Sequence, residues 1–109
     1  MLINRTITLP AVDTGYSLYD LLKAEEPNLR ERVAGLRLQT GPAGTTYLVP
    51  NPGGYTSTTG NVPDDYGWRI DVDNPYQVDQ HPANQISLTE YYLGTDAAGT
   101  LVHVHAYLY

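Results

Sequence analysis

Residues 86–109 read ISLTEYYLGTDAAGTLVHVHAYLY, and this stretch decides the fold. In its second half, aliphatic residues at positions 102, 104, 106 and 108 alternate with histidines and tyrosines. A period of two is typical of a strand with one buried face. Residues 86–92 alternate in the same way, and the polar, glycine-containing residues 94–99 between the two runs are typical of a turn. The stretch therefore predicts a long β-hairpin at the end of the chain.

The alternation also predicts which side chains of this hairpin are buried. A shift of one residue would reverse every assignment, so the prediction is specific. Glu90 falls on the aliphatic face, and we expect it near the end of the sheet or paired with an arginine, because an unpaired buried carboxylate is costly. The side chains expected to point inward are Ile86, Leu88, Tyr92, Val102, Val104, Ala106 and Leu108.

Upstream of this hairpin the patterns are shorter. Residues 2–9 alternate and predict a half-buried strand. Ser17 begins a pattern resembling a capping box, and leucines follow at positions 18, 21 and 22, so we expect a short helix over residues 17–25. Residues 28–34 are expected to form another turn of helix. Two strands, 36–40 and 45–49, are expected to form a hairpin around a Gly-Pro-Ala-Gly turn.

The middle of the chain predicts one further strand and a long connection. Residues 68–73 alternate, with Trp68, Ile70 and Val72 expected inward and the charged residues outward. Residues 50–67 are rich in Gly, Pro and Thr and predict a loosely packed connection. Short strands separated by turns, with one early helix, indicate a mainly β fold: an antiparallel β-sandwich or jelly-roll-like barrel with one short N-terminal helix. At 109 residues, we expect a single domain over residues 1–109.

Charge and composition narrow the classes of partner. Twelve acidic and six basic residues leave a net charge of −6, and residues 60–109 hold seven acids against Arg69 alone. A surface of that sign repels phosphate backbones and anionic lipids, so we expect neither nucleic acid nor membrane as a partner. The sequence lacks cysteine, which excludes disulfides and thiolate chemistry. The first residues do not have the pattern of a signal peptide.

The residues best suited to metal binding are His103 and His105, which share one face of the predicted strand. Cupins, a class of small metal-binding barrels, use such a pair. A metal would need further ligands from Asp71, Asp73, His81 or Glu90, which follow no recognisable order, so we expect two surface histidines and no metal or other cofactor. Asp71 with Asp73 and Asp64 with Asp65 are best explained as solvated charges. We expect no catalytic residue and no enzyme.

The aromatic residues predict a contact surface. The chain has ten tyrosines, one tryptophan and no phenylalanine. A sheet face of tyrosine and histidine, rather than lysine and glutamate, is a candidate surface for binding a partner. The alternative is that this face packs against a second layer of the sandwich. The residues expected on this partner-binding face are Tyr91, His103, His105, Tyr107 and Tyr109.

With these features the chain resembles the small bacteriophage virion proteins that decorate or cement capsids. The resemblance lies in its length, the absence of cysteine, the Gly/Pro/Thr-rich loops, the acidic charge and the aromatic C-terminal strands. It implies a non-enzymatic structural protein, made in the host cytoplasm and located on the outside of the virion. Its implied partner is the major capsid protein, whose shell it would stabilise as a homo-oligomer, a dimer or a trimer.

Two other functions stay open. One is a carbohydrate- or host-binding β-sandwich module of a phage tail, in which tyrosines would stack on sugars. The other is a small metal-dependent, cupin-like enzyme that would use His103 and His105.

Overall fold

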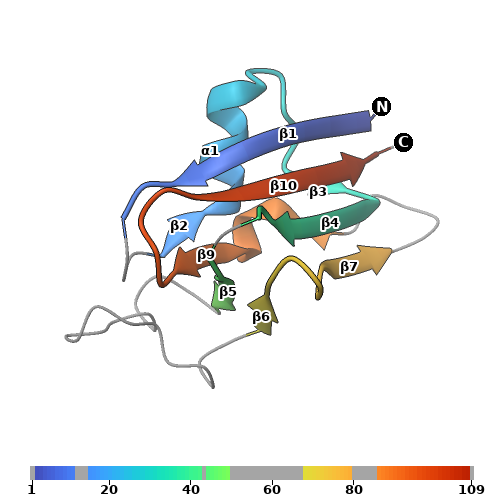
Figure 1. The fold of residues 1–109 in the computed structure, drawn as a ribbon. Helices are drawn as coiled ribbons and strands as arrows, with labels where there is room; N and C mark the ends of the chain where they lie inside the picture. Colours follow the sequence, from blue (N-terminus) through green and yellow to red (C-terminus); the bar gives the residue numbers. More distant parts are fainter. Residues whose placement is uncertain (1, 12–14, 43, 50–67, 80–85, 109) are drawn as a thin grey trace.

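The structure is a computed structural model that describes residues 2–11, 15–42, 44–49, 68–79 and 86–108. Within these ranges it is mainly β, with one α-helix and one 3₁₀ turn (Figure 1). Residues 50–67, for which we predicted a loosely packed connection, lie outside the described residues. The elements are β1 (Leu2–Leu9), β2 (Tyr16–Ser17), α1 (Leu18–Glu25), β3 (Arg32–Val33), β4 (Gly35–Thr40), β5 (Thr46–Val49), β6 (Trp68–Ile70), β7 (Tyr76–Asp79), β8 (Ile86–Ser87), η2 (Leu88–Glu90), β9 (Tyr92–Thr95) and β10 (Thr100–Tyr107).

Eight of the described strands form a sandwich of two four-stranded antiparallel sheets, and β3 and β8 form a separate two-stranded sheet. The first sheet has the order β1-β10-β4-β7 and the second sheet has the order β2-β9-β5-β6. β1 pairs with β10, β2 with β9, β3 with β8, β4 with β7 and β5 with β6. These are the pairs of one long hairpin, which two further pairs, β10 with β4 and β9 with β5, close into a roll. This is the strand order of a jelly roll, and the predicted fold class is confirmed.

The core lies between the two sheets and is built from the predicted alternation. In β1, Ile3, Ile7 and Leu9 are at most 3% exposed, and in β10, Val102 and Val104 are fully buried. Ala106 and Leu108 continue this series at 1% and 6% exposure. Burial of each large aliphatic side chain contributes about 1.5–3 kcal/mol to folding. The inward assignment of the last strand is therefore confirmed.

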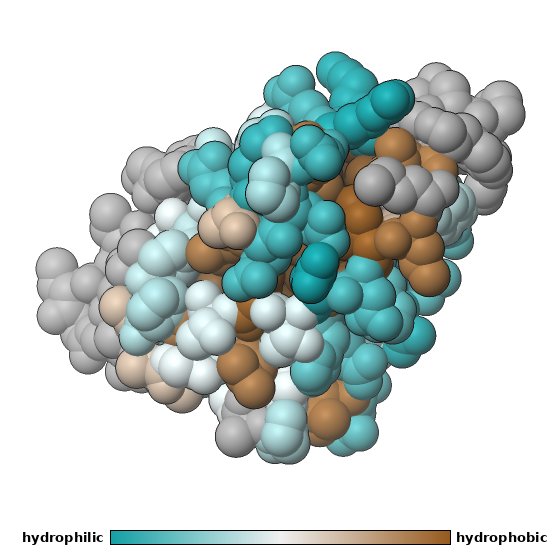
Figure 2. All heavy atoms as spheres, turned by 90° about the horizontal axis from the view of Figure 1, so that it is seen from above, coloured by the Kyte–Doolittle hydropathy of each residue, from teal (hydrophilic) through white to brown (hydrophobic). Residues whose placement is uncertain are grey.

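Arg5 occupies an inward position of β1 without burying its charge. β1 is an edge strand of the first sheet, so the side chain can leave the core at that edge. Its guanidinium meets the Glu26 carboxylate at the end of α1, with Nη2 2.6 Å from Oε1. Figure 2 shows that hydrophilic side chains cover much of the side that carries α1 and β1, with hydrophobic areas between them. An inward charge on an edge strand also discourages pairing with another chain.

The helix begins and ends where the sequence predicts. The Ser17 hydroxyl accepts a hydrogen bond from the Asp20 backbone N–H at 3.3 Å, so Ser17 is the N-cap. Leu18 and Leu22 are fully buried and attach the helix to the core. The N–H of Glu26 closes the last turn on the carbonyl of Leu22. The predicted helix over 17–25 is confirmed.

The predicted helical turn at residues 28–34 is wrong. Arg32 and Val33 form β3 and pair with Ser87 and Ile86 of β8. Val33 is fully buried, and the N–H of Leu88 donates to the carbonyl of Glu31. The backbone of this segment therefore forms its hydrogen bonds with β8 and Leu88, on the other arm of the rolled hairpin. These tertiary contacts outweigh the weak helical pattern of the segment.

Both predicted hairpins are also wrong, although their strands exist. β4 lies in the first sheet and β5 in the second, while β9 lies in the second sheet and β10 in the first. Each short turn therefore crosses from one sheet to the other instead of joining two paired strands (Figure 1). The crossing turns use Gly44 and Gly99, whose φ angles of 88° and 81° suit glycine.

The expected strand over residues 86–92 is interrupted by the 3₁₀ turn η2. The turn changes the phase of the alternation, so Glu90 is exposed and does not lie on the aliphatic face. The turn also reverses the predicted sides of the two tyrosines that follow, Tyr91 and Tyr92. Tyr91 packs against the core, whereas Tyr92 precedes the buried Leu93 and points to the outer side of the second sheet. The inward assignment of Tyr92 is therefore wrong, while those of Ile86 and Leu88 are confirmed.

The predicted strand over residues 68–73 is shorter than expected. β6 ends at Ile70, which is fully buried, and Asp71 forms an isolated bridge with Asn74. The Asp71 carboxylate accepts a hydrogen bond from the N–H of Asp73 at 3.1 Å, the pattern of an Asx turn. This turn leaves Val72 48% exposed, so its predicted inward position is wrong.

Thr95 and Thr46 are directly paired across β9 and β5, and they predict opposite effects of the same substitution. Both are fully buried. Thr95 Oγ1 lies 2.9 Å from the carbonyl oxygen of Thr45 and 2.7 Å from Thr100 Oγ1. Thr46 Oγ1 has no hydrogen-bond partner among the described residues. Thr95→Val should lower the free energy of unfolding by about 1–3 kcal/mol, because its buried partners lose their bonds.

Thr46→Val is the matched control and should leave the stability unchanged or raise it by about 1 kcal/mol, because no bond is lost. Urea denaturation of both variants measures the difference. Equal destabilisation by the two substitutions would contradict the hydrogen bonds assigned to the Thr95 hydroxyl.

Candidate binding surfaces

The histidines and Tyr107 of β10 lie on the side of the first sheet that faces away from the core, here called the outer face. His105 is exposed, and His103 and Tyr107 are half-buried. His103 Nδ1 lies 2.9 Å from Thr6 Oγ1 of the neighbouring strand β1, within hydrogen-bond distance. This contact orients the His103 ring along the sheet. The predicted outward direction of these three side chains is confirmed.

The Tyr107 ring lies flat across the outer face because a glycine stands beneath it. Gly35 is its direct partner on β4, and a Cβ atom on Gly35 would come within 2.0 Å of the Tyr107 ring. The hydroxyl donates to Asp79 Oδ1 on β7 at 2.9 Å. The side chain therefore extends from β10 across β4 to β7, with its ring over Gly35 and its hydroxyl bonded to Asp79.

Side chains from all four strands of the first sheet surround Tyr107. They form a shallow hollow of about 80 Å³ at the end of the sheet where β1 begins and β10 ends. Leu2, at the rim of this hollow, is 72% exposed. We call this surface the terminal patch, and it comprises Leu2, Arg37, Gln77, Asp79, His105 and Tyr107.

Tyr91 does not join the terminal patch. Its hydroxyl is 3.0 Å from that of Tyr76 on β7, and the two rings meet edge to face at 5.8 Å. Burial, the hydrogen bond to Tyr76 and the nearby Glu90 carboxylate raise the pKa of Tyr91 well above its ordinary value. Tyr91 therefore links the two sheets as a neutral phenol, and its predicted position beside the β10 residues is wrong. Tyr109 lies outside the described residues.

The histidine pair is placed unfavourably for a metal site inside the sandwich. His103 and His105 point away from the core, whereas Val102 and Val104 point into it. His81 lies outside the described residues. Among the residues that the structure describes, no three or more His, Asp or Glu side chains are grouped so that they could hold a metal ion.

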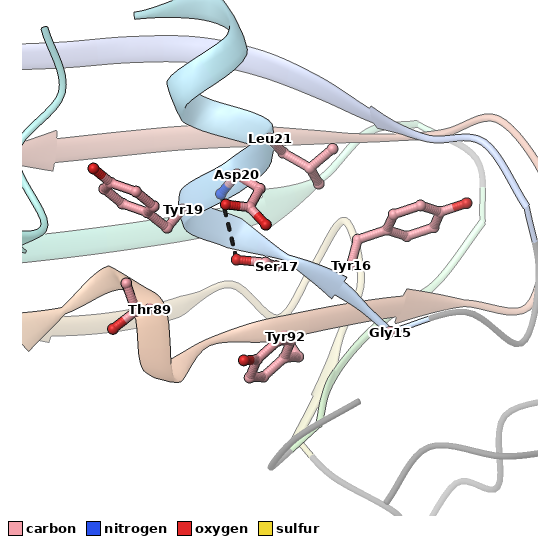
Figure 3. Close-up of a pocket in the computed structure, with 8 residues that line it drawn as sticks. All are labelled: Gly15, Tyr16, Ser17, Tyr19, Asp20, Leu21, Thr89 and Tyr92. Atoms are coloured by element: carbon pink, nitrogen blue, oxygen red, sulfur yellow. Dashed lines mark hydrogen bonds between the residues drawn. The ribbon is translucent and has the colours of Figure 1, made fainter. Parts of the chain in front are cut away.

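A second surface, which the sequence did not predict, lies on the opposite side of the sandwich. It is an open groove of about 600 Å³ between the start of α1 and the η2–β9 segment (Figure 3). Tyr16 precedes the N-cap Ser17, Tyr19 lies in the first turn of α1 and Tyr92 follows η2, so no single period connects all three tyrosines. We call it the tyrosine groove, and it is lined by Gly15, Tyr16, Ser17, Tyr19, Asp20, Leu21, Thr89 and Tyr92.

No family model matches the chain, and the comparisons with curated proteins and with solved structures found no match. Within the described ranges, no helix is long and apolar enough to cross a membrane.

Proposed function

We propose that the protein is a bacteriophage capsid decoration protein that binds the outer surface of the major capsid protein and stabilises the head. The jelly-roll sandwich supports this proposal, because viral capsid proteins use this architecture. Lectins and cupins use it as well, so the argument depends on the surfaces of the domain.

The terminal patch is the observation that carries the proposal. It combines an exposed aliphatic side chain, a tyrosine held flat by Gly35 and Asp79, an arginine and a histidine. Aromatic residues and arginine are enriched in protein interfaces, and a ring that is already held in place loses little entropy on binding. The patch is small, and this suits a capsid, whose repeated subunits would bind several copies of a homo-oligomer at once.

Of the alternatives, the cupin-like enzyme gains no support from the described residues. A cupin-like metal site would require the histidine pair to face the interior of the barrel, and these side chains face the opposite way. We therefore propose a binding function without catalysis, located on the exterior of the virion.

Substitution of Tyr107 provides the test. On this proposal the genome that encodes the chain also encodes a major capsid protein, and shells assembled from that protein should co-sediment with the wild-type domain. Tyr107→Ala should weaken this binding about thirtyfold, the effect of losing about 2 kcal/mol at a hot spot. The variant should still fold, because the ring lies on the outer face and the core stays intact, and thermal melting measures the cost of the lost contacts with Gly35 and Asp79.

Tyr92→Ala is the matched control, since it removes a half-buried tyrosine from the opposite side of the sandwich. It should co-sediment like the wild type. The proposal fails if the wild-type domain does not bind the shells, or if the two variants bind equally well.

A further inference from the structure

The tyrosine groove is built on paired backbone. Ser17 and Tyr92 stand opposite each other in the antiparallel pair of β2 and β9. The N–H of Leu18, the first residue of α1, donates to the carbonyl of Tyr91 at 3.0 Å. One wall of the groove is therefore hydrogen-bonded to the other, and its shape does not depend on a ligand.

Aromatic rings and polar groups alternate around this groove. In Figure 3, Tyr16 and Tyr19 extend to opposite sides of Asp20, and Thr89 and Tyr92 lie across from Ser17 and Asp20. The Tyr16 hydroxyl accepts a hydrogen bond from the N–H of Ala11 at 3.2 Å. The Tyr19 ring lies 5.8 Å from the Lys23 ammonium, a cation–π contact. These contacts hold two of the three rings in place, and both rings also pack against the core.

The polar groups that line the groove are acceptors and hydroxyls, and the Lys23 ammonium beside them is engaged with the Tyr19 ring. Asp20 is exposed, and its carboxylate has no hydrogen-bond or ion-pair partner among the described residues. Near the rim, Thr89 donates to the Glu31 carboxylate at 3.3 Å, and Glu90 is exposed. No lysine or arginine is among the lining residues. Phosphates, sulfates and sialic acids would therefore be repelled, and so would nucleotides.

The ligand that fits these groups is an uncharged sugar. A pyranose ring presents a patch of C–H groups, which packs on the face of an aromatic ring, and hydroxyls around its edge. An aspartate can accept two of these hydroxyls at once, and Ser17 and Thr89 add further hydrogen-bonding groups. A volume of about 600 Å³ is within the range of pockets that bind small molecules and has room for one or two sugar rings.

We propose that the tyrosine groove is a binding site for a neutral saccharide. The inference goes beyond the proposed function and does not depend on it. The groove lies on the opposite side of the sandwich from the terminal patch, so a domain bound to a capsid through that patch would present the groove to the surroundings. Such a domain would attach a particle to a glycan surface.

The test uses the full chain and a glycan array that includes both neutral and sialylated oligosaccharides. Neutral glycans should bind, and the corresponding disaccharide, titrated into ¹⁵N-labelled protein, should shift the amides of Tyr19, Thr89 and Tyr92. Tyr92→Ala should weaken binding about tenfold, as expected for the loss of one aromatic contact. Asp20→Asn should also weaken it, while the Asp20 N–H still donates to Ser17 and the helix stays capped.

Tyr107→Ala is the control and should bind the saccharide like the wild type. The inference is overturned if no neutral glycan binds, if sialylated glycans bind better than their neutral counterparts, or if Tyr92→Ala binds as tightly as Tyr107→Ala. Capsid co-sedimentation is measured separately, so a failure at the groove is distinguishable from a failure at the terminal patch.

Discussion

Val102→Asp should leave the domain largely unfolded. Val102 is fully buried in β10, which pairs with β1 on one side and β4 on the other. Its direct partners, Ile7 and Thr40, are buried and carry no charge, so the new carboxylate would be unpaired. A substitution of this kind costs about 5 kcal/mol, at the upper end of single-residue effects. A small domain has about 5–15 kcal/mol of stability, so the loss is comparable with the whole.

Leu101→Asp is the matched control, because it places the same acid one residue earlier on the outward side of the same strand. Leu101 is 38% exposed, so the cost should be about 1 kcal/mol. Circular dichroism and thermal melting of both variants measure the difference. If Leu101→Asp is as damaging as Val102→Asp, the inward and outward assignments of β10 are wrong.

Leu22→Ala should produce the second large effect, a loss of about 2–5 kcal/mol in the free energy of unfolding. Leu22 is fully buried and belongs to the core cluster. α1 contacts β1 and η2, so the cavity would open where the helix covers the side of the sandwich. Chemical denaturation should show a lower midpoint with an unchanged slope.

Glu25→Ala is the control on the same helix. Its side chain is exposed, and the substitution should change the stability by less than about 0.5 kcal/mol. If both substitutions lower the free energy of unfolding by similar amounts, helix propensity and end contacts stabilise the helix, and its buried leucines do not.

Three candidate site residues also show how far the sequence could predict the surface. His105 and Tyr107 were placed correctly, because they continue an unbroken alternation along β10. Tyr91 was misplaced, because the 3₁₀ turn η2 shifts the phase of the alternation just before it. The turn depends on packing, since Leu88 is fully buried and its N–H is bonded to Glu31 on the other arm of the roll.

The sequence by itself determined the mainly β class, the buried sides of β1 and β10 and the position of the helix. These features follow from local periods of two and 3.6 residues and from a local cap at Ser17. The tertiary structure alone decided which strands pair, because any strand edge offers the same N–H and C=O groups. β9 and β10 each bury one face in the same core, yet they lie in different sheets, and their local sequence patterns do not distinguish this arrangement from a paired hairpin. The tyrosine groove also depends on tertiary structure, since residues 16–20 and 89–92 meet only through the long-range pairing of β2 with β9.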